Sequence, residues 1–238
     1  MNWSIRYAIA QRAQGTEGNP LIPSAVQTLS SACNNFYGNG GSIEIHNFAD
    51  GKQVNVDAKR SAGYATQLQQ TKGIQETNPV VGKAKTWLST CLDRLSKAYS
   101  TGNPGAGGAN PNRTVLLAKD KNGNAVGHLA VTPSEDGKSH EVIGLSALTG
   151  NHGAAYALQH ALVKHVLAPQ GSDLKSKIYS HYTAPDVTNN ALQFHQAIGR
   201  RIGTPTSKYK SSWTVGDVQD IANGTQVDNE NVLNVGGR

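Results

Sequence analysis

The sequence predicts an α/β fold of the α+β type, in which helices flank a mixed, mostly antiparallel sheet. Three short apolar segments follow one another, at 114–119, 125–132 and 142–148. The tight-turn sequences Asn122-Gly123 and Asp136-Gly137 separate them, which is typical of an antiparallel meander. A helical pattern follows at 154–167, and strand and helix patterns then alternate. The predicted core order is strand-strand-strand-helix-strand-helix-strand.

Composition limits the function classes. The chain has 238 residues, enough for a substantial core, but only 37% are hydrophobic and 6% aromatic, so part of it is expected to be loop or tail. No apolar run approaches the ~20 residues of a membrane helix. Two cysteines, Cys33 and Cys91, are too few for a disulfide framework or a cysteine-based metal site. No histidine pair has ligand spacing beside a carboxylate, so no metal site is predicted.

The N-terminus carries Arg6 inside its only apolar patch and no small-residue cleavage site after it, so we expect no Sec-type signal peptide. Few cysteines favour a reducing compartment. We expect a cytoplasmic protein, or one delivered into another cell by a route other than Sec.

The net charge of +6 favours anionic partners in general. The densest basic group is Arg200-Arg201 with Lys208 and Lys210, and it has no interleaved aromatic residues at base-stacking spacing. We interpret these charges as solvated surface, which makes nucleic acid the weaker partner class.

Early elements are expected in this order. Residues 3–10 read as a strand, and a helix begins near Ile22-Pro23-Ser24 and stops near Asn34, with Cys33 on its apolar face. Residues 42–48 alternate like a strand that forms a hairpin with 53–56.

The next segments are less uniform. Residues 64–77 have little periodicity and read as a loop, whereas 83–99 carry one apolar stripe and read as a helix, with Cys91 in its core face. The Gly/Asn-rich stretch 101–112 reads as a linker. We therefore divide the chain into an N-terminal part (1–112), a well-patterned core (113–215) and a polar tail (216–238), frayed from Asn223.

The strand at 142–148 meets the helix through Thr149-Gly150-Asn151-His152-Gly153, and Pro169 and Gly171 end that helix. A strand that feeds a helix through a glycine turn leaves backbone N–H groups unpaired at the helix start, which favours anion binding. A strand at 177–183, a helix at 188–198 and short strands at 201–209 and 212–215 follow.

Two blocks of this pattern resemble the GNAT N-acetyltransferase superfamily. Its pyrophosphate turn reads (Gln or Arg)-x-x-Gly-x-(Gly or Ala), and Gly150-Asn151-His152-Gly153-Ala154-Ala155 keeps the second and third of these positions. Its later helix reads Asn-x-x-Ala-x-x-(Leu or Phe)-Tyr-x-x-x-Gly-Phe. Here 188–200 keep Ala191, Phe194 and Gly199, with His195 at the tyrosine position and Arg200 at the final phenylalanine.

The resemblance implies an enzyme that uses acetyl-CoA as co-substrate and acetylates an amine of a protein or small molecule. It implies a cofactor site made of a splayed strand edge, the turn and the later helix: Leu145, Ser146, Ala147, Asn151, His152, Gly153, Ala154, Ala155 and Asn190. It also implies His195 as the acid that protonates the thiolate, with Tyr182 or Tyr179 as alternatives. Glu141 is the candidate base, because it precedes Leu145 by four residues and should share its face.

Other functions stay open. A cysteine-histidine hydrolase would need an exposed nucleophile, and Cys33 is the better placed cysteine although no motif flanks it. The lost Gln/Arg, Asn and Tyr positions are compatible with a non-catalytic interaction or effector module on a degenerate core. A basic nucleic-acid-binding protein is the third alternative.

Overall fold

The computed structural model describes residues 21–47, 114–133, 139–147, 153–174, 178–183, 189–202 and 209–235. The α-helices are α2 (Leu21–Gly38), α5 (Ala154–Ala161), α6 (Asn189–Ala197) and α7 (Val215–Gly224), and α5 continues as a π-helical segment (Leu162–Leu167) and a 3-10 segment (Ala168–Leu174). The strands are β1 (Ser42–Asn47), β2 (Thr114–Lys119), β3 (Ala125–Pro133), β4 (Ser139–Ala147), β5 (Ile178–Thr183), β6 (Arg201–Ile202), β7 (Tyr209–Trp213) and β8 (Val232–Asn234). The elements expected at 3–10, 53–56, 64–77, 83–99 and 101–112 lie outside the described residues.

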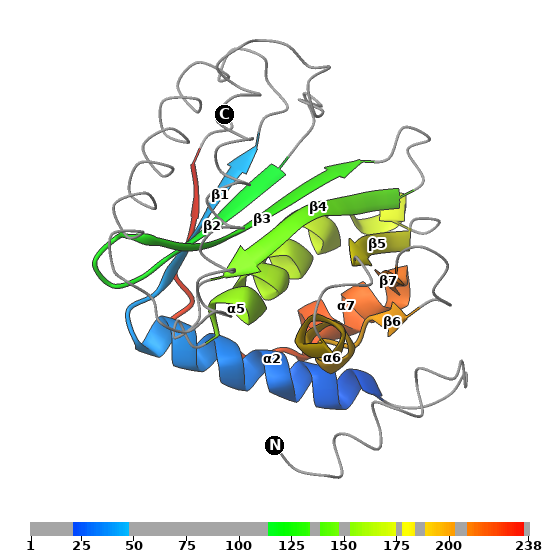
Figure 1. Cartoon of the computed structure of the whole chain (residues 1–238), viewed down its shortest axis with the longest axis horizontal. Coiled ribbons are helices and arrows are strands. Elements are labelled where there is room, and N and C mark those ends of the chain that lie inside the picture. The colour runs from blue at the N-terminus through cyan, green and yellow to red at the C-terminus, as the bar shows by residue number, and fades with distance from the viewer. Residues whose placement is uncertain are drawn as a thin grey trace.

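The strands form one sheet in the order β6-β7-β5-β4-β3-β2-β1-β8 (Figure 1). Every neighbouring pair is antiparallel except β4–β5 and β1–β8. The mixed, mostly antiparallel sheet and the predicted order of the core are therefore confirmed.

The meander β2–β3–β4 closes as the turn sequences predict. The Asp120 carboxylate accepts hydrogen bonds from the backbone N–H groups of Asn122 and Asn124, both at 2.9 Å. Gly123 adopts a φ of 79°, which a residue without a β-carbon reaches at no steric cost. Local turn chemistry thus sets the register that continues into β3.

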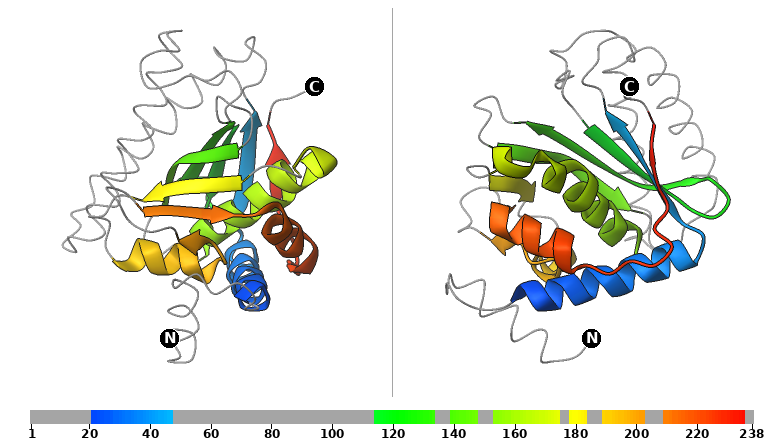
Figure 2. Two further views of the ribbon diagram at one scale, coloured as in Figure 1. Left: turned by 90° about the vertical axis from the view of Figure 1, so that its right-hand side faces the viewer. Right: turned by 180° about the vertical axis from the view of Figure 1, so that it is seen from behind.

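Helices α2, α5 and α7 pack together on one side of the sheet, as the turned views show (Figure 2). The first of them extends to Gly38, four residues beyond the expected stop at Asn34. Phe36 and Tyr37 are buried in the core, so the apolar face continues for another turn. The helix ends where the N–H of Gly41 bonds back to the carbonyl of Phe36.

The expectation of a frayed tail is wrong for the described residues up to Val235. Thr214 and Asp217 form a capping box that starts α7, with the two side chain–backbone bonds at 3.1 and 2.9 Å. The chain then crosses α2, where the side chain of Asn34 bonds Gln226 and Asp228, and ends as β8, parallel to β1. These long-range contacts supply the hydrogen bonds that a free tail would take from water.

Strands β6 and β7 lie within the range of the expected strands at 201–209 and 212–215, of which residues 203–208 lie outside the described residues. They pair antiparallel, with Arg201 opposite Ser212 and Ile202 opposite Ser211. The second ends at Trp213 because Thr214 is the cap of the following helix. Within the described chain, no helix is both long enough and apolar enough to cross a bilayer.

Candidate functional site

The two parallel strands at the centre of the sheet separate along their length. β4 and β5 pair from Ser139 opposite Ile178 to Val142 opposite His181, and β4 then continues to Ala147 (Figure 1). Past Val142, no strand in the described part of the chain pairs with that edge of β4. The last five residues of β4 therefore have an edge without a partner strand among the described residues, and we call this the β4–β5 gap.

A β-bulge lies where the gap begins. In the pairing with β3, Gly144 is opposite Ala130 but Val142 is opposite Val131, so Ile143 is the extra residue. Bulges bend a strand and increase its twist, which turns the end of β4 away from β5. In the described part of the chain, the edge of β4 at Leu145, Ser146 and Ala147 has no partner strand.

Helix α5 begins beside this gap with an uncapped N-terminus. Gly153 is the N-cap residue with a φ of 92°, no side chain caps the helix, and its first turn holds no acidic residue. The N–H groups of Ala154 and Ala155 thus have no side-chain acceptor, and the helix dipole favours an anion here. Asn151 and His152 lie outside the described residues.

Helix α2 covers the start of α5. A β-carbon built on Gly153 would overlap the carbonyl oxygen of Ala32, lie 3.0 Å from the carbonyl carbon of that residue and lie 3.1 Å from the β-carbon of Phe36. Only glycine fits this contact. Gly153, which matches a glycine of the GNAT turn motif, therefore has a packing role that is independent of any ligand.

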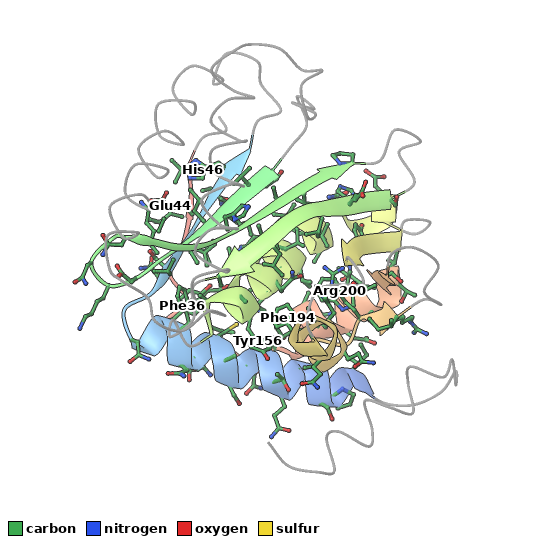
Figure 3. The ribbon with its side chains drawn as sticks, viewed as in Figure 1. Phe36, Glu44, His46, Tyr156, Phe194 and Arg200 are labelled. Carbon is green, nitrogen blue, oxygen red and sulfur yellow. The ribbon has the colours of Figure 1, made fainter. Side chains whose placement is uncertain are left out.

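His195 lies on α6 with its side chain 2% exposed. Its ring contacts that of Phe194 at 5.3 Å between centroids, and Phe194 meets Tyr156 of α5 at 4.8 Å in an edge-to-face pair (Figure 3). The helix holding the candidate acid is thus fixed to the helix holding the candidate anion site. Asn190 is the second residue of α6, and Tyr182 is one residue past the last β4–β5 pair, opposite Lys210 of β7.

The expectation that Glu141 shares the face of Leu145 is wrong. Leu145 is opposite Leu129 and Glu141 is opposite Thr132, three residues further along β3, so the two side chains lie on opposite faces. The bulge at Ile143 shifts the alternation by one residue. Leu145 packs on the core beneath the helices, whereas Glu141 lies on the other face and is half-buried.

The burial of Arg200 and of Cys33 bears on two other expectations from the sequence. Arg200 is 1% exposed, so it is not part of a solvated basic patch, whereas Arg201 is exposed and pairs with Asp217 at 3.1 Å. The sequence alone could have indicated that residue 200 is buried, because Arg200 occupies the position where the GNAT motif has a phenylalanine. Cys33 is also buried in the core, and burial raises the pKa of its thiol, which is the opposite of an activated nucleophile.

Neither a metal cluster nor a hydrolase triad emerges from the described ranges. No group of three or more His, Cys, Asp or Glu residues there is arranged to hold a metal ion. His128 is buried on β3, and burial lowers its pKa to about 4, as expected of a structural histidine.

Comparisons with known proteins give a distant structural likeness. No protein-family model matches the sequence, and no curated protein matches it. A variant of the spermidine N-acetyltransferase SpeG from Vibrio cholerae aligns at a TM-score of 0.41 and 10% identity over 75% of this chain and 96% of that one. The N-acetyltransferase PseH of Campylobacter jejuni aligns at 0.34 and 14% over 73% and 98%.

A Desulfovibrio desulfuricans protein assigned to the GNAT acetyltransferases aligns at a TM-score of 0.41 and 10% identity over 72% of this chain and 96% of that one. At these values no residue role is transferred from any of these proteins. The site is described by the chain's own geometry.

Proposed function

We propose that this chain is an acetyl-CoA-dependent N-acetyltransferase that acetylates an amine of a protein or small molecule. The observation that carries the proposal is the β4–β5 gap, which opens at the Ile143 bulge beside the uncapped start of α5. A free strand edge next to a helix N-terminus offers amide partners and an anion site in one place.

The parts of acetyl-CoA match these groups chemically. The backbone of Leu145, Ser146 and Ala147 would pair with the amides of the pantetheine arm, because that edge of β4 has no partner strand in the described chain. The N–H groups of Ala154 and Ala155, with the preceding turn, would bind the pyrophosphate, since no carboxylate in the first turn of α5 competes for them. The bound co-substrate supplies an activated thioester carbonyl.

The reaction requires a base and an acid from the chain. The amine nitrogen attacks the thioester carbonyl, an N–C bond forms and the C–S bond breaks. The amine proton goes to a base, for which we propose Glu141, and the departing thiolate takes a proton from His195 or Tyr182. Because Glu141 lies on the face of the sheet away from the helices, the amine would approach the gap from that face.

The test uses a pair of variants at Ala155, which is half-buried in the first turn of α5. Ala155→Glu adds a carboxylate that the helix dipole favours but that repels a pyrophosphate, and Ala155→Gln is the neutral control of the same size. Thermal unfolding is measured with and without acetyl-CoA. We expect acetyl-CoA to raise Tm for the wild type and for Ala155→Gln, and to leave Ala155→Glu unchanged.

A second readout follows CoA release with a panel of polyamines, small amines and peptides. Release that depends on the amine would support the transferase. The absence of a Tm shift at millimolar acetyl-CoA would contradict the proposed transferase activity. The fold would then serve as a scaffold for binding another partner.

A further inference from the structure

Arg200 is a buried cation whose protein contacts are neutral. Its Nη2 donates to Oε1 of Gln159 at 2.9 Å, and its guanidinium carbon lies 3.9 Å from the centroid of the Trp213 ring. Gln159 and Trp213 are fully buried. A cation–π contact and one hydrogen bond to an amide stabilise the charge only in part.

The backbone forces residue 200 into this position. Gly199 has a φ of 79° and ends α6, with the N–H of Arg200 bonded to the carbonyl of His195 at 3.0 Å, as in a helix C-cap. The indole N–H of Trp213 donates to the carbonyl of Ile198 at 3.0 Å and ties β7 to the same turn. The side chain that follows the turn therefore enters the core.

No carboxylate of the described residues forms an ion pair with Arg200. Asp217 binds Arg201, and Glu230 binds Lys164 and His165. Burial lowers the pKa of Arg200 to about 9, which leaves the side chain protonated at neutral pH. An unpaired buried charge destabilises a fold strongly, so a compensating negative charge is expected.

Three unsatisfied polar atoms at this cation can act only as hydrogen-bond donors. They are Nε and Nη1 of Arg200 and Nε2 of Gln159, whose Oε1 is already occupied by Arg200. The hydroxyl of Tyr179, which can donate or accept, is a further buried group without a partner, on the residue of β5 that pairs with Trp213. A guanidinium with two unpaired N–H donors beside an unpaired amide N–H group needs an acceptor, and its positive charge favours an anion.

We propose that Arg200, Gln159 and the neighbouring Tyr179 form an internal binding site for a small monovalent anion of the size of chloride. The ion is small because Arg200, Gln159, Trp213 and Tyr179 are each at most 1% exposed. Water could satisfy the neutral donors but would not neutralise the guanidinium. The anion is a structural component that connects α5, the turn after α6 and β5, and it is distinct from the proposed acetyl-CoA site.

The experiment compares three proteins at constant ionic strength while sodium chloride replaces sodium gluconate. They are the wild type, Arg200→Met, which removes the buried charge, and Arg201→Met, which removes the neighbouring exposed charge. We expect chloride to raise the Tm of the wild type and of Arg201→Met by about 3 °C, and to leave Arg200→Met unchanged.

A bromide soak of wild-type crystals tests the site without any substitution in the protein. An anomalous peak within hydrogen-bonding distance of the Arg200 guanidinium supports the site. The absence of a peak, or an equal response to chloride in the wild type and Arg200→Met, overturns it and leaves water as the partner of these donors.

Discussion

The carbonyl carbon of Ala32 lies 3.0 Å from the point that a β-carbon on Gly153 would occupy, and its oxygen lies closer still. One atom of α2 thus sets how closely that helix approaches the start of α5. Because both partners are backbone atoms, neither can move without displacing a helix. The glycine of the candidate pyrophosphate turn is required by the fold before any ligand binds.

Replacing Gly153 by alanine should destabilise the protein strongly. The new methyl group meets the Ala32 carbonyl, and the φ of 92° adds strain, so we expect a loss of about 3 kcal/mol in the free energy of unfolding. Gly123→Ala is the control, because Gly123 has a φ of 79° but nothing within 4 Å of an added β-carbon, and it should lose only about 1 kcal/mol. Equal losses in denaturant unfolding would contradict the contact.

Glu230 should make the free energy of unfolding depend on pH in the acid range. Its carboxylate accepts hydrogen bonds from His165 at 2.9 Å and from Lys164. Burial alone would raise the pKa of Glu230, but these two bonds outweigh it and lower the pKa to about 2. The stabilisation is present above the unfolded pKa near 4.5 and is lost as the pH falls toward 2.

The Glu230→Gln variant tests this directly. At neutral pH the variant should be less stable by up to about 3 kcal/mol, because the charge-assisted bonds are lost. Between pH 4.5 and 2 its stability should fall less steeply than that of the wild type. Parallel acid unfolding curves would show that the carboxylate contributes no stability in this window.

Two buried histidines should add a second pH dependence at milder acidity. Burial lowers the pKa of His128 and of His160 to about 4, against about 6.5 in the unfolded chain. The folded state therefore binds fewer protons, and stability is full above pH 6.5 and declines as the pH falls toward 4. His128→Leu should reduce that slope in urea unfolding series, and an unchanged slope would contradict the assignment to this residue.

His195 should affect turnover more than binding. If it protonates the thiolate, His195→Phe should lower kcat about 100-fold with KM for acetyl-CoA little changed. His195→Tyr restores the acid found in the resembling family and should recover much of kcat, with a shifted pH profile. A role in packing alone would instead give two variants with similar kcat and a common loss of Tm.

Local sequence signals determined the central elements. The apolar run and the Asn122-Gly123 turn after it placed the strand at 114–119, whose bounds the structure repeats, and the glycine turn located the start of α5. These features depend on residues only a few positions apart. The capping box of Thr214 and Asp217 is a signal of the same kind, and α7 could have been predicted from it.

Long-range contacts decided the rest. The parallel pairing of β8 with β1, with Val232 opposite Ile43, joins residues from opposite ends of the chain, and no local pattern encodes such a pair. It converted an expected tail into an edge of the sheet. The gap depends in the same way on where the pairing of β4 with β5 stops.

The faces of the candidate site also belong to the tertiary structure. A single extra residue at Ile143 moved Glu141 to the face opposite Leu145, because alternation holds only while the ladder is regular. Arg200 reads as surface by its chemistry and lies in the core because the Gly199 turn directs it there. The sequence by itself determined the order of the elements and the residues near the gap. Strand pairing and packing decided on which face of the sheet each side chain lies, because pairing and packing depend on partners that are distant in sequence.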